Sequence, residues 1–217
     1  MHDSCHEEEY KGHKIKIVQS DCDESPREWD NLGIMACFHK RYDLGDKEHG
    51  INEDNFSSWN QMENYIRKTL KAAICLPIYM YDHSGITVAT HPFSCPWDSG
   101  QIGFIFITKE KIKKEMCHVG KILPDKSHKL TEIKRVTKKV LTRTEEMLES
   151  EVVTFDQYLR GDVYGYIIEA PDGSIFDSCY GIYGLDECIK EAKSMLGSDD
   201  KNLDGKENIT HENNSTL

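Results

Sequence analysis

The stretch from Leu76 to Lys109 constrains the fold most, because it is the most apolar part of the chain. Apolar runs at 74–81, 86–89 and 101–107 indicate three strands. A turn at 82–85 and a loop at 91–100 that contains two prolines separate these runs. We therefore expect a hairpin followed by a third strand at the centre of a sheet.

Strand-type segments elsewhere also occur in clusters, at 14–19, 34–38, 163–169 and 174–180. Capping residues and apolar stripes of helical period predict helices at 58–70, 109–116, 126–149, 154–159 and 186–196. Strands that cluster, rather than alternating singly with helices, favour the α+β class over a doubly wound α/β sheet. We expect a mixed or mostly antiparallel sheet with helices packed on it.

Composition divides the chain into three parts. Residues 1–12 are polar and acidic and predict a flexible arm, and residues 198–217 are polar with scattered Leu and Ile, which predicts a disordered tail. The segment between them, 13–197, is predicted to form a single α+β domain.

The net charge of −11 argues against binding of nucleic acid or of an anionic membrane by the whole chain. Residues 109–143 nevertheless carry 12 Lys and Arg against 4 Asp and Glu. Their most basic part, residues 126–143 of the helix predicted over 126–149, leaves nucleic acid as an alternative partner, although a solvated helix face explains the pattern more simply. No apolar run reaches the roughly 18 residues that span a bilayer, so no membrane contact is expected.

A possible catalytic group combines His83 and Cys95 with Asp98, or with Asp82 in its place, and these residues lie close together in the sequence. A cysteine nucleophile needs a base to form its thiolate, and the base needs an acceptor that orients it. The structural alternative is that Asp98 caps a turn, His83 is a loop residue and Cys95 is a small buried side chain. Cysteine–histidine enzymes bring these residues together in space, so proximity in the sequence is weak evidence for a catalytic group, and the structural alternative is favoured.

A metal site is a second hypothesis, with Cys22, Cys37 and His39 as ligands at two strand ends and Asp21 as an optional fourth ligand. Their spacing matches no common zinc module, in which paired ligands lie roughly two to four residues apart. The alternative is two structural thiols and a surface histidine. None of the eight cysteines forms a CxxC pair, and no nucleotide-binding glycine loop is present, so no cofactor is predicted.

Five segments together resemble a family of small uncharacterised proteins encoded by bacteriophages, prophages and plasmids. The resemblance extends over about 15–184 and is carried by the segments 17–33 (IVQSDCDESPREWDNLG), 37–46 (CFHKRYDLGD), 81–87 (YDHSGIT), 93–103 (FSCPWDSGQIG) and 177–184 (DSCYGIYG). It implies a mobile-element origin and expression inside a bacterial host. The family brings no activity, cofactor or catalytic residue to this chain.

The expected function is therefore that of a phage-type accessory protein in the host cell cytoplasm. The absence of a catalytic signature and the mixture of acidic and basic segments favour a non-enzymatic module that binds a host or viral protein. The alternative is a small cysteine- and histidine-dependent enzyme that uses the 82–99 loops.

Overall fold

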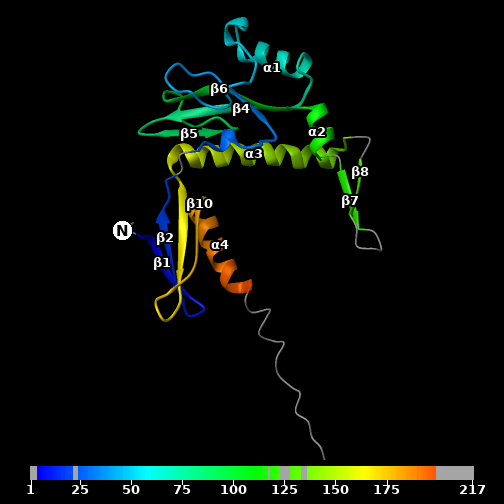
Figure 1. Ribbon diagram of the computed structural model, residues 1–217. Coiled ribbons are helices and arrows are strands. Elements are labelled where there is room, and N and C mark those ends of the chain that lie inside the picture. Colours follow the sequence, from blue (N-terminus) through cyan, green and yellow to red (C-terminus); the bar gives the residue numbers. More distant parts are fainter. Residues whose placement is uncertain (1–3, 22–23, 117, 123–127, 133–135, 199–217) are drawn as a thin grey trace, which may run out of the picture. The chain divides into compact units, whose positions relative to one another are not determined.

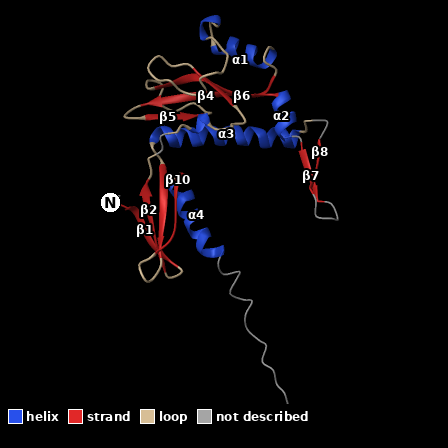
Figure 2. Ribbon diagram, viewed as in Figure 1, coloured by secondary structure: helices blue, strands red, loops and turns tan. Residues whose placement is uncertain are grey.

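The computed structural model describes residues 4–21, 24–116, 118–122, 128–132 and 136–198 (Figures 1 and 2). The chain divides into two compact units. In the described residues, the central unit comprises 24–161, and the terminal unit combines 4–21 with 162–198. Helices and antiparallel sheets occur in both units, so the predicted α+β class is confirmed. The single domain over 13–197 stays a prediction, because a compact unit need not fold alone.

The central unit is built on a four-stranded antiparallel sheet in the order β3-β6-β4-β5. The strands are β3 (Ile34–Cys37), β4 (Ala72–Asp82), β5 (Ile86–Ala89) and β6 (Ser99–Thr108). The expected hairpin and third strand are thus confirmed as β4, β5 and β6, but only β4 and β6 are central, because β5 is an edge strand. The loops 82–85 and 91–98 lie at one end of these strands.

Two helices cover the two faces of this sheet (Figure 1). Helix α1 (Trp59–Lys68) packs Met62 and Ile66 against one face, where Phe104 and Phe106 are buried. Helix α3 (Lys138–Arg160) places its apolar stripe on the other face. A shorter helix, α2 (Lys109–Met116), follows β6 directly. Successive side chains of β6 point to opposite faces of the sheet, so this strand contributes to two hydrophobic cores, one on each side.

The predicted helices at 126–149 and 154–159 are wrong in their boundaries. Residues His128–Glu132 form strand β8, which pairs with β7 (His118–Ile122). Helix α3 begins only after Thr137, whose hydroxyl accepts from the Val140 amide at 3.3 Å, and it runs on to Arg160. Thr154, which resembled a helix cap, instead donates to the Ser150 carbonyl within α3 at 3.1 Å.

The basic helix proposed over 126–143 is therefore not continuous. Its first half contains β8, and only Lys138, Lys139 and Arg143 lie exposed on the first turns of α3. The structure does not describe the side chains of the other basic residues of this segment. Among the described helices, none has the length and hydropathy required to cross a membrane.

The terminal unit is a second antiparallel sheet in the order β1-β2-β9-β10. Its elements are β1 (Ser4–Tyr10), β2 (His13–Gln19), β9 (Val163–Glu169), β10 (Ile175–Tyr183) and α4 (Leu185–Ser198). Helix α4 buries Cys188 and Ala192 against Ile15, Ile17 and Ile168.

Strand β1 corrects the prediction of a flexible arm. Glutamate has low strand propensity, but Glu7 and Glu9 stand opposite Lys16 and Lys14 across the β1–β2 pair. Lys14 also forms an ion pair with Glu7 at 2.6 Å. Charge pairing across the strands offsets the poor propensity of the acidic run. The predicted disordered tail at 198–217 lies outside the described residues apart from Ser198, the last residue of α4.

Candidate functional site

The loops 82–85 and 91–98 are fastened to each other at the end of the central sheet. The Asp82 amide donates to the Asp98 carbonyl at 2.9 Å, and the His83 amide donates to the Gly85 carbonyl at 3.1 Å. The Ser99 hydroxyl donates to the Cys95 carbonyl. These hydrogen bonds anchor the 91–98 loop, which is rich in polar and aromatic residues, to the rigid end of the sheet, as binding loops on rigid scaffolds are held.

The three residues of the catalytic hypothesis meet at the Asp98 carboxylate. His83 Nδ1 lies 3.4 Å from Asp98 Oδ2, and the Cys95 thiol donates to the same oxygen at 3.8 Å. Within the described residues, no hydrogen bond joins Cys95 to His83 directly. A cysteine–histidine pair needs the imidazole beside the thiol, to remove its proton. Here a carboxylate occupies that position, an arrangement that favours a structural role for Asp98 in tying the two loops together.

A second connection joins these loops to the segment after β3. The Arg41 guanidinium donates to Asp82 Oδ2, and the Tyr42 hydroxyl donates to the same carboxylate at 3.3 Å. The Arg41 side chain lies over the Tyr42 ring, 5.3 Å from its centroid, and His39 stacks on Tyr42 at 5.1 Å. Asp82 therefore holds an arginine and an aromatic stack next to the 91–98 loop.

Trp97 stands at the outer side of this arrangement with 91% of its surface exposed. It lines a cavity of about 310 Å³ together with His39, Arg41, Asp82 and Asp98. A large side chain that gains so little from burial in its own fold is unusual, because indole burial is strongly favourable. Tryptophan and arginine are also the side chains that most often anchor protein interfaces.

The residues of the metal hypothesis do not form a ligand set. Cys37 is partly buried, and burial raises the pKa of its thiol to about 12, which disfavours the thiolate that a metal requires. His39 is committed to its stack on Tyr42, and its Nδ1 accepts from the Arg41 amide at 3.4 Å. Cys22 lies outside the described residues. Among the residues that the structure describes, no group of three or more His, Cys, Asp and Glu side chains is placed to hold a metal ion.

A buried ion network that sequence reasoning missed lies elsewhere in the central unit. Arg27, in the short 3₁₀ helix Pro26–Glu28, has a side chain that is only 3% exposed. Its guanidinium donates to both Asp46 oxygens at 2.8 and 3.1 Å, to Glu151 at 2.9 Å and to the Gly33 carbonyl at 2.9 Å. Burial disfavours the charge, but Asp46 and Glu151 outweigh it and raise the pKa of Arg27. The network ties two loops to helix α3.

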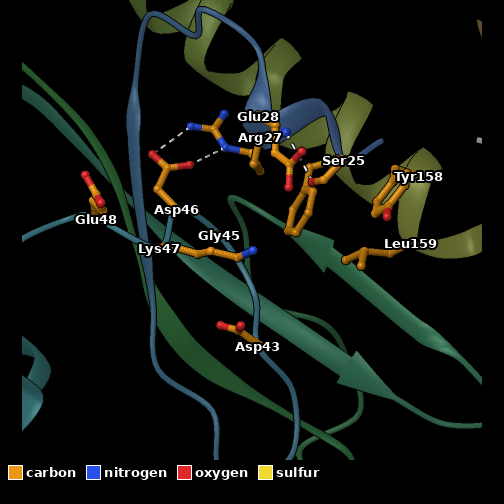
Figure 3. Close-up of a pocket in the computed structure, with 11 residues that line it drawn as sticks. Ser25, Arg27, Glu28, Asp43, Gly45, Asp46, Lys47, Glu48, Tyr158 and Leu159 are labelled. Atoms are coloured by element: carbon orange, nitrogen blue, oxygen red, sulfur yellow. Dashed lines mark hydrogen bonds and ion pairs between the residues drawn. The ribbon is translucent and has the colours of Figure 1, made fainter. Parts of the chain in front are cut away.

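A cavity of about 720 Å³ opens beside this network (Figure 3). Its floor comes from α3, where Phe155 is 3% exposed and stacks on Tyr158 with ring centroids 6.3 Å apart. Its remaining wall carries the charged side chains Glu28, Asp43, Lys47 and Glu48. None of these four side chains has a hydrogen bond or ion pair to another described residue. The cavity therefore combines an apolar floor with unpaired charges.

Three cavities follow one another along the segment 37–48. The 720 Å³ cavity shares Asp43 with a neighbour of about 420 Å³, which in turn shares His39 and Arg41 with the cavity beside Trp97. This row, which we call the loop groove, runs along an irregular segment at the β3 edge of the sheet. The Asp46 carboxylate fixes that segment by accepting from the Met35 amide at 2.9 Å.

Comparison with known proteins identifies no relative: no family model, no curated protein and no solved structure matches the chain.

Proposed function

We propose that this protein is a non-catalytic binding module that docks a host or viral protein on the surface around Trp97. The resemblance of its sequence motifs to phage-encoded proteins supports a role inside an infected bacterial cell. The partner's main contact would be the indole of Trp97, with Arg41 beside it.

The single observation that carries this proposal is the 91% exposure of Trp97 on a loop that is already ordered. Hydrogen bonds at Asp82, Asp98 and Ser99 fix this loop before any partner arrives. Ordering a loop on binding costs free energy, and that cost is small for a loop that is fixed in advance. A fixed, exposed indole is therefore suited to recognition of a partner.

The grouping of Cys95, His83 and Asp98 is the one observation in favour of an enzyme. It gives weaker support, because the thiol faces a carboxylate instead of the imidazole. His83 and Asp98 are also 64% and 42% exposed, so water competes for both groups. A cysteine- and histidine-dependent enzyme is therefore the second candidate, and this hypothesis predicts an unusually reactive Cys95.

The proposal is tested by affinity capture with the immobilised protein from lysate of infected bacteria, in parallel with two variants. Trp97→Ala should lose the captured protein. Trp29→Ala, in which a tryptophan that is 47% exposed is removed from another part of the same unit, should retain it. With the partner purified, Trp97→Ala should weaken binding about thirtyfold, equivalent to about 2 kcal/mol. Equal capture by all three proteins would refute the proposal.

A further inference from the structure

We propose that the 720 Å³ cavity binds a cationic side chain of the partner, an arginine or a lysine. The loop groove would then bind a basic segment of that protein. This inference rests on the proposed function and names the chemistry of the partner. Its starting point is the composition of the cavity wall, which is acidic above an aromatic floor.

The charges of the wall favour a cation. Arg27 and Asp46 neutralise each other through two hydrogen bonds and contribute no free charge to the cavity. The remaining charged groups are the carboxylates of Glu28, Asp43 and Glu48 and the single ammonium of Lys47. Three negative groups against one positive group leave an excess of two negative charges.

The floor favours a cation that is carried on an apolar stem. Tyr158 and Leu159 present aromatic and aliphatic surface from one side of α3, and the buried Phe155 ring lies against Tyr158. A guanidinium or ammonium group is attracted to the face of a tyrosine ring, and its methylene stem packs on apolar surface. A carboxylate or phosphate would gain nothing from this floor and would face three like charges.

Lys47 is the residue that distinguishes a cationic from an anionic ligand in this cavity. Figure 3 shows its side chain extending from the loop toward the α3 side of the cavity. It is exposed and has no ion pair with another described residue. Lys47 thus contributes the one positive charge of the cavity wall, and a partner's arginine or lysine would have to displace it. If the cavity took an anion, Lys47 would instead be its main ligand.

The experiment titrates the full-length protein with Nα-acetyl-arginine N-methylamide and, as a neutral isostere, with the citrulline derivative. Binding is followed by chemical-shift changes of the 43–48 amides. Only the arginine derivative should bind. The double variant Glu28→Gln/Asp43→Asn should weaken it about tenfold, as expected for the loss of two partly exposed charge pairs. Lys47→Met should strengthen it. Equal binding of the two derivatives, no binding of either, or weaker binding by Lys47→Met would overturn the inference.

The two proposals fail separately. Trp97→Ala should leave binding of the arginine derivative unchanged, because Trp97 lines the other end of the loop groove. Loss of partner capture with intact arginine binding would refute only the role of Trp97. Conversely, a partner that depends on Trp97 but binds the double variant as tightly as the wild type would refute only the cationic anchor.

Discussion

Replacement of Arg27 by methionine should destabilise the central unit by about 3 kcal/mol. The change removes four hydrogen bonds of a side chain that is 3% exposed. Breaking a buried ion pair by removing one partner costs about 3–5 kcal/mol, because the remaining charge is left unpaired. We expect the lower end of this range. Asp46 and Glu151 are 22% and 15% exposed and keep their hydrogen bonds from backbone amides.

The assay is urea denaturation followed by tryptophan fluorescence, which reports on the central unit alone because all three tryptophans belong to it. A loss of about 3 kcal/mol is a large share of the roughly 5–15 kcal/mol by which domains are stable. Lys114→Gln is the control. This side chain is 83% exposed and, among the residues that the structure describes, pairs only with its neighbour Glu115, so its removal should change stability by less than about 0.5 kcal/mol.

A triple variant tests the physical reason. Asp46→Asn and Glu151→Gln, added to Arg27→Met, remove the two stranded charges but keep oxygen acceptors for the backbone amides. The triple variant should therefore recover about 1 kcal/mol relative to the single one. A loss below about 1 kcal/mol in Arg27→Met, or a triple variant less stable than the single variant, would contradict this reasoning.

Three further predictions concern the same unit. Gly103→Ala should destabilise it by about 3 kcal/mol in the same assay, because a β-carbon there collides with the Ala36 carbonyl of β3, whereas Gly100→Ala, with open space around it, should change little. Burial lowers the pKa of His49, so its contribution to stability should be complete above the unfolded-state pKa of about 6.5 and should be lost as the pH falls from there through the folded-state pKa. In His49→Gln this loss of stability at low pH should be smaller. An unchanged pH dependence of stability in the variant would contradict the prediction. Cys95 should react with iodoacetamide in the native protein no faster than a free thiol such as glutathione. Partly buried Cys37, whose pKa is raised to about 12, should react more slowly than Cys95. Mass spectrometry of the alkylated peptides measures both rates, and a Cys95 rate far above that of glutathione would favour the enzyme.

Local patterns were sufficient to predict the centre of the fold. The apolar runs that became β4, β5 and β6 and the turn between β4 and β5 depend on neighbouring residues, so their signals are visible in the sequence. The same kind of pattern misled at β8, because a segment of alternating basic and apolar residues fits a helix and a hairpin alike. Pairing with β7 decided between them, and such pairing is not a property of one segment.

For the sites as well, groupings within neighbouring segments could be predicted from the sequence, whereas contacts between distant segments could not. Cys95, His83 and Asp98 could be grouped from the sequence because their loops adjoin one hairpin, but the sequence could not show that His83 and Cys95 each contact the Asp98 carboxylate instead of one another. The network of Arg27 escaped prediction because its partners Asp46 and Glu151 lie 19 and 124 residues away. Contacts at that separation depend on the tertiary fold.

The most direct test of the proposed function is the dissociation constant of the purified partner for the wild-type protein, Trp97→Ala and Trp29→Ala. Thermal unfolding followed by tryptophan fluorescence must first show that both variants are folded. We expect Trp97→Ala to bind about thirtyfold more weakly and Trp29→Ala to bind as the wild type does. Equal affinities of the wild type and Trp97→Ala would show that the exposed indole is not the contact, and the binding surface proposed here would be wrong.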